Sequence, residues 1–121
     1  GGKQIRPNIH IKDLISAIDC LTFTKKKLRH NIFNAGFENL TISEIANKIK
    51  KRTGAKIKIN KNKDIRSYRQ DSSRLLKFGF KPKYNVSLAI NELIHFFNSK
   101  SKFNFTKKNF NLLRMKELNI K

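Results

Sequence analysis

Apolar residues recur at helical spacing most clearly in residues 42–52. They occupy positions i, i+3, i+4 and i+7 of one helix face: Ile42, Ile45, Ala46 and Ile49. Thr41 and Glu44 have the spacing of a capping box, and Gly54 can supply a left-handed stop. These local signals predict a helix that begins after Thr41 and ends before Gly54.

The same periodicity and the positions of turn residues predict four further helices. A helix over residues 86–98 has a strong apolar stripe, and a helix over residues 12–22 has a stripe formed by Ile11, Leu14, Ile18 and Leu21. Asp71 is expected to be the N-cap of a short helix that ends before Gly79. A final helix is expected around residues 107–118, within a polar tail.

Three short segments, residues 9–11, 32–35 and 55–59, are predicted to be strands. The last of them alternates strictly between apolar and charged residues, which is typical of a strand with one solvated face. Residues 64–70 are expected to be extended. The chain as a whole therefore predicts an α/β fold class in which short strands alternate with amphipathic helices.

Composition adds a strong positive charge to this picture. The 121 residues suit one domain, and 28 Lys or Arg against 8 Asp or Glu give a formal charge of +20. This charge indicates either a contact surface for RNA, DNA or anionic lipid, or a solvated surface rich in lysine. Lys, Ile, Asn and Phe supply 60 of the residues. Because A- and T-rich codons favour these four amino acids, genome composition is an alternative source of much of the charge, and the solvated lysine-rich surface is the favoured interpretation.

Several classes of protein are excluded by what the sequence lacks. No apolar stretch is long enough to span a bilayer, and charged residues rather than an apolar run follow the first residues. The single cysteine, Cys20, cannot form an internal disulfide, so a secreted disulfide scaffold is excluded. A reducing cytoplasm is the simplest location, and Cys20 is expected in the core.

Candidate catalytic and metal-binding residues are few. The five glycines are too scattered for a phosphate-binding loop, and the histidines at positions 10, 30 and 95 lack metal-ligand spacing. No metal site is therefore predicted. His10 can be interpreted as a ligand or base, but a structural histidine beside a strand is favoured. His95 falls off the apolar stripe and is expected to be solvated.

A series of short motifs in order carries a resemblance to a known family. They are Arg-x-x-Ile-His-Ile-x-Asp at 6–13, Ile-Phe-Asn-Ala-Gly at 32–36, Thr-x-x-Glu-Ile-Ala at 41–46, Arg-Ser-Tyr-Arg-x-Asp at 66–71 and Phe-Gly-Phe-x-Pro at 78–82. Their order and spacing over residues 1–98 resemble the C-terminal part of the extended short-chain dehydrogenase/reductases, the NAD-dependent nucleotide-sugar epimerases and dehydratases. The resemblance implies the C-terminal substrate-binding lobe of a Rossmann-type enzyme over residues 1–98, followed by a polar tail at 99–121.

The resemblance also implies which residues contact a nucleotide-diphosphate sugar. Arg6 matches an arginine that reaches the diphosphate in relatives, and a guanidinium can bind phosphate oxygens bidentately. Lys61 stands where relatives usually carry a second phosphate-binding arginine. Arg66 is close enough in sequence to share that role. Asn8 occupies a position where an aromatic residue is common, so part of the sugar pocket is expected to differ.

The catalytic part of the family pattern is missing from this chain. Neither the glycine-rich NAD loop nor the Tyr-x-x-x-Lys pair is present, since Tyr68 is followed four residues later by Ser72 and Tyr84 by Leu88. The resemblance therefore implies a fragment without catalytic or cofactor-binding residues, inactive by itself. NAD would bind to the part of the parent enzyme that lies outside this chain. With NAD, the parent enzyme would transiently oxidise a sugar carbon before epimerisation, dehydration or reduction.

The missing nucleotide-binding domain leads to an expectation about folding and partners. Residues 41–98 are expected to hold the core, while residues 1–35 rearrange or pair with a second copy, because their usual cover is absent. The alternative function is that of a small basic nucleic-acid-binding protein. Scattered lysines and mostly apolar-patterned Phe residues favour, at most, weak and sequence-indifferent nucleic-acid binding.

Overall fold

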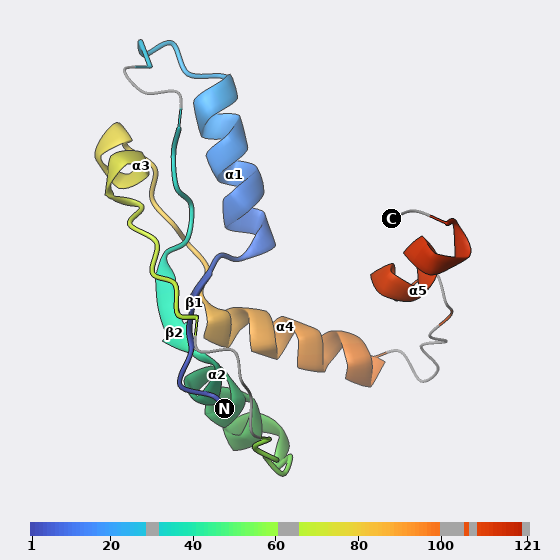
Figure 1. Cartoon of the computed structure of the whole chain (residues 1–121). Helices are drawn as coiled ribbons and strands as arrows, with labels where there is room; N and C mark the ends of the chain where they lie inside the picture. Colours follow the sequence, from blue (N-terminus) through green and yellow to red (C-terminus); the bar gives the residue numbers. More distant parts are fainter. Residues whose placement is uncertain (29–31, 61–65, 100–105, 107–108, 120–121) are drawn as a thin grey trace.

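The computed structural model describes residues 1–28, 32–60, 66–99, 106 and 109–119. In these ranges the chain is mixed α/β, with two antiparallel strands and five helices (Figure 1). The elements are β1 (Ile5–Asn8), α1 (Ile11–Thr22), β2 (Glu38–Thr41), α2 (Ile42–Thr53), α3 (Ser73–Phe78), α4 (Val86–Ser99) and α5 (Asn111–Glu117). No helix in the described part of the chain is long and apolar enough to cross a membrane.

The two strands form a short ribbon at the centre of the molecule, with Ile5 opposite Thr41 and Asn8 opposite Glu38 (Figure 1). Residues 66–68 lie along the other edge of β1, where the Tyr68 N–H donates to the Ile5 carbonyl over 3.0 Å. Pro7 lacks an amide donor, and a narrow ribbon of this kind tolerates it. The ribbon thus joins three segments that are far apart in sequence.

The predicted strands lie elsewhere than expected. Residue 10 is not in a strand but is the N-cap of α1, where the His10 side chain accepts the Lys12 N–H. Residues 32–35 and 55–59 have no regular secondary structure. Residues 55–59 are exposed throughout, so their alternating pattern has no sheet to pack against. The predicted strands at 9–11, 32–35 and 55–59 are therefore wrong.

The predicted helices are present, with small shifts at their ends. α2 has both hydrogen bonds of the capping box between Thr41 and Glu44, and Gly54 ends it with φ of 72°. Ser72, rather than Asp71, is the N-cap of α3. The Asp71 carboxylate still accepts the Ser73 N–H over 2.9 Å, so it supports the start of the helix from one residue earlier.

The apolar core lies where α1 and α3 meet the segments beside them. Ala17, Leu75 and Phe80 are buried there. Partly buried residues pack around them: Cys20, Leu21, Phe33, Ala35 and Phe37. Residues from 1–35 therefore help to form the core, and the expectation that residues 41–98 hold it alone is wrong.

The predicted apolar stripe of α1 is only partly covered. Asp13 and Ala17 are the buried residues of the helix, and Leu21 of the stripe packs against the core. Ile11 and Ile18 of the stripe are 61% and 55% exposed, and Ile15 is 53% exposed. Helix α1 consequently has an inner face on the core and an outer apolar face in solvent.

Candidate functional site

A cavity lies between the N-terminal segment, β1, α2 and the residues that follow it. Its volume is about 580 Å³. The apolar lining consists of Ile42, Ala46, Ile57 and Ile59. Polar side chains also face it: Gln4, Arg6, Ser43, Asn47, Lys58 and Asn60. The described lining residues include two cationic side chains and no carboxylate, so the cavity suits an anionic group with polar substituents.

Arg6 reaches this cavity from β1 and is firmly positioned. Its guanidinium carbon lies 5.1 Å from the centre of the Tyr68 ring, which is a cation–π contact. Its Nη1 donates to two backbone carbonyls, that of Ile5 over 2.9 Å and that of Arg66 over 2.8 Å. These contacts order the planar head of Arg6 before any ligand binds, which lowers the entropy lost on binding.

The first turn of α2 closes one side of the cavity with its amides already bonded. The Ser43 N–H donates to the Gly2 carbonyl over 2.9 Å, and the Ile42 N–H donates to the Gln4 carbonyl over 3.1 Å. Gly2 has φ of 96°, and a Cβ there would lie 2.3 Å from the Ser43 Oγ, so glycine fits this close approach. An anion in the cavity would therefore be bound by side chains.

Among the described residues, Asn8 and Arg66 do not join Arg6 in the wall of this cavity. The Asn8 amide donates to the carbonyls of Arg6 and Glu38, at 2.7 and 3.0 Å, and so stabilises the ribbon. Arg66 contributes its backbone carbonyl to Arg6. Lys61 lies outside the described residues.

Five polar residues of the cavity were not identified from the sequence: Gln4, Ser43, Asn47, Lys58 and Asn60. None of them stands at a position to which the resemblance assigns substrate contact. The acid-free stretch around Lys58 was the one available signal of an anion site.

Electrostatics at the start of α2 are set by its cap. Backbone and side-chain hydrogen bonds from Thr41 lower the pKa of Glu44 from its ordinary value of 4.5, and Lys48 and Arg69 act in the same direction. Glu44 does not line the cavity. Its charge serves the helix start.

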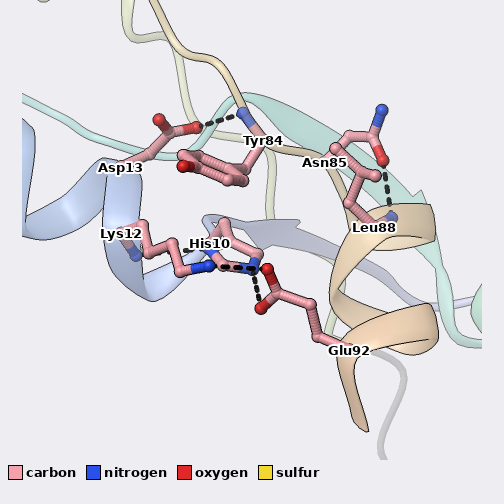
Figure 2. A network of polar contacts seen from close by, with 7 residues as sticks. All are labelled: His10, Lys12, Asp13, Tyr84, Asn85, Leu88 and Glu92. Carbon is pink, nitrogen blue, oxygen red and sulfur yellow. Dashed lines mark hydrogen bonds and ion pairs between the residues drawn. The ribbon is translucent and has the colours of Figure 1, made fainter. Parts of the chain in front are cut away.

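A second polar cluster joins α1 to α4 and to the segment before it (Figure 2). His10 Nδ1 accepts the Lys12 N–H over 3.2 Å, and His10 Nε2 lies 3.1 Å from Glu92 Oε2. Lys12 Nζ donates to Glu92 Oε1 over 2.7 Å, and this contact is the main reason that the pKa of Glu92 is lowered. The Tyr84 ring stacks on His10 at 4.7 Å.

Asp13 completes this junction from a buried position. Its carboxylate is 1% exposed and accepts the N–H groups of Lys83 and Tyr84, the latter over 2.9 Å (Figure 2). His10 is likewise buried and hydrogen-bonded, which fits a structural histidine, although it begins a helix. His10 and Asp13 are buried in the cluster, while Lys12 and Glu92 close it at the surface with about half of each side chain exposed. All four are engaged in internal contacts, so the cluster holds α1 in place.

Metal binding has no support in the described ranges, where no group of three His, Cys, Asp or Glu residues could hold an ion. Comparisons of the chain with protein-family models, with curated proteins and with solved structures found no match. Functional interpretation therefore depends on the cavity at Arg6, the charge distribution and the sequence resemblance.

Proposed function

We propose that this chain is the substrate-binding lobe of an NAD-dependent nucleotide-sugar epimerase or dehydratase, and that the cavity at Arg6 receives the diphosphate sugar. The observation that carries the proposal is the position of Arg6, held between the Tyr68 ring and two carbonyls at the wall of a cavity of about 580 Å³. This is the arginine to which the sequence resemblance assigns diphosphate binding.

The composition of the cavity suits each part of such a ligand. Arg6 can bind two phosphate oxygens through its fork, and Lys58 supplies a second, more flexible cation. The amides of Gln4, Asn47 and Asn60 can bond sugar hydroxyl groups. The two cations and the lack of a carboxylate among the described lining residues favour retention of a doubly charged diphosphate.

In this proposal the two parts of the parent enzyme have separate roles. NAD, bound by a nucleotide-binding domain outside this chain, supplies hydride transfer. Residues 1–98 bind and orient the substrate, and residues 99–121 form an accessory tail. The chain alone carries no turnover, and its setting is the cytoplasm.

The outer face of α1 is the proposed contact for that nucleotide-binding domain. Ile11, Ile15 and Ile18 are each more than half exposed. Several large apolar side chains exposed on one helix are typical of an interaction surface. Without the domain, copies of this chain associate through the same face. The charge of +20 opposes association at low salt, so added salt strengthens it.

Calorimetric titration of the full chain with nucleotide-diphosphate sugars tests the proposal. Arg6→Gln is expected to weaken binding by roughly tenfold or more, because a charged hydrogen-bond donor is lost. Arg74→Gln, which removes the same charge from an exposed position on α3, is the matched control and leaves binding unchanged. NAD is expected not to bind. Absence of diphosphate-sugar binding, equal effects of the two variants, or micromolar NAD binding would each contradict the proposal.

A further inference from the structure

The positive charge of the chain is concentrated in one segment. Residues 45–63 contain eight Lys or Arg and no Asp or Glu, a net charge of +8 over 19 residues. The other 102 residues contain 20 cations and 8 acids, a net charge of +12. A composition bias acting on the whole gene would spread lysine along the chain, so this density has a local origin.

The structure exposes this charge on one end of the molecule. Every residue from Ile49 to Asn60 is exposed, across the last turns of α2 and the segment that follows. We define the cationic end by Lys50, Lys51, Arg52 and Lys56. Among the described residues, the ion pairs join Glu92 to His10 and Lys12, and Arg114 to Glu117. They do not include the four cations of this end.

A structural role explains part of this cluster but not all of it. Cations stabilise the C-terminal end of a helix dipole, which applies to Lys50, Lys51 and Arg52. Arg52 is also held to α4, where its Nε donates to Asn91 Oδ1 over 2.5 Å. Lys56 lies beyond the Gly54 cap and has neither role. The cationic end is thus more highly charged than its fold requires.

We propose that the cationic end binds the phosphodiester backbone of nucleic acid without sequence preference. Four exposed cations within residues 50–56, with no acid among them, attract phosphate groups, and their binding releases counterions from the nucleic acid. No aromatic residue occurs between positions 42 and 67, so base stacking has no platform there. Binding to this end therefore depends on charge and on salt.

An anionic membrane fits the same region less well. Membrane-surface segments combine cations with apolar side chains that enter the bilayer. The large apolar residues nearest to Lys56 in sequence, Ile57 and Ile59, line the cavity at Arg6 and are 39% and 68% exposed. The sequence between positions 42 and 67 contains no Trp, Phe or Leu, the residues that typically form the apolar face of a membrane-surface segment.

The test compares two triple variants of the full chain that lose the same charge. The first is Lys50→Gln/Lys51→Gln/Lys56→Gln, which spares the Arg52 contact with α4. The control is Lys25→Gln/Lys27→Gln/Lys81→Gln, whose lysines are exposed and lie outside the cationic end. Fluorescence anisotropy with mixed-sequence single-stranded RNA and duplex DNA is measured over a salt series, and circular dichroism confirms folding.

The first triple variant is expected to bind roughly tenfold or more weakly. The slope of its plot of log affinity against log salt concentration is expected to become less steep by about 2 to 3. The control is expected to change affinity by less than about threefold, since general charge is a weaker effect than direct phosphate contact. Equal losses in both variants would overturn the proposal in favour of net charge alone. Preferential binding to phosphatidylserine vesicles, abolished in the first variant, or strong preference for one nucleotide sequence, would overturn it as well.

Discussion

Helices α1 and α2 have the same length of 12 residues, yet they are held in different ways. α1 packs on a core in which Leu75 is 1% and Ala17 3% exposed. α2 has no buried residue and is fixed by its cap and by side-chain hydrogen bonds to α4, such as Lys48 to Ser87. One end of the molecule thus depends on apolar burial, and the other on polar contacts at its surface.

The two ends of the molecule are therefore expected to differ in local stability. Burial of apolar side chains supplies most folding free energy, whereas exposed hydrogen bonds contribute little each. Local opening should therefore begin at α2 and the exposed residues after it, which line the cavity at Arg6 and carry the cationic end. The ligand-facing side of the chain is the side that can move at low cost.

The largest effect is expected at the centre of the core. Leu75→Ala removes a fully buried side chain and should lower the free energy of unfolding by about 3 kcal/mol. Leu76→Ala, at the next position of α3 where the side chain is 45% exposed, should cost less than about 1 kcal/mol. Urea denaturation of both variants measures the difference. Equal costs would mean that the core at Leu75 does not dominate stability.

A smaller loss is expected where a buried carboxylate anchors the chain. Asp13→Ala leaves the amides of Lys83 and Tyr84 without their acceptor and should cost about 2 kcal/mol. Asp19→Ala, at an exposed position of the same helix, should change stability by less than about 0.5 kcal/mol. Thermal denaturation monitored by circular dichroism compares them. A neutral Asp13→Ala variant would show that the amides find other partners.

The smallest expected effect concerns the cap of α2 and its response to acid. Thr41→Ala should cost about 1 kcal/mol, seen as faster hydrogen exchange of α2 amides. The folded-state pKa of Glu44 lies below its ordinary value of 4.5, so its contribution is complete above that pH and is lost as pH falls through the folded value. Glu44→Gln should remove this acid-dependent part of α2 protection. A pH profile identical to that of the unmodified chain would contradict the role of Glu44.

Sequence patterns succeeded where the physical cause is local. The start and end of α2 depend on Thr41, Glu44 and Gly54, which interact within a few residues of the helix itself. Strand positions depend instead on distant partners: β1 is bonded to Thr41 on one edge and to Ser67 and Tyr68 on the other. No pattern within Ile5–Asn8 contains that information.

The buried carboxylate of α1 and most of the cavity could not be predicted for a related reason. The three isoleucines of α1 are all exposed, whereas Asp13 is buried and its carboxylate accepts the N–H groups of Lys83 and Tyr84, about 70 positions away. At the cavity, the motif around Arg6 identified one residue, while Lys58 and Asn47 arrive from segments about 40 or more positions away. Their roles depend on tertiary structure.

The anchoring of Asp13 also determines what a cut in the backbone would do. Residues 25–28 are exposed, and they follow α1, whose own contacts with residues 83 and 84 span about 70 positions. A protease that cuts the chain there breaks one peptide bond and leaves the hydrogen bonds of Asp13 and β1, and the packing of Ala17 in the core, in place. The two pieces would stay together as one particle, and the molecule can therefore be divided at this point into complementary fragments.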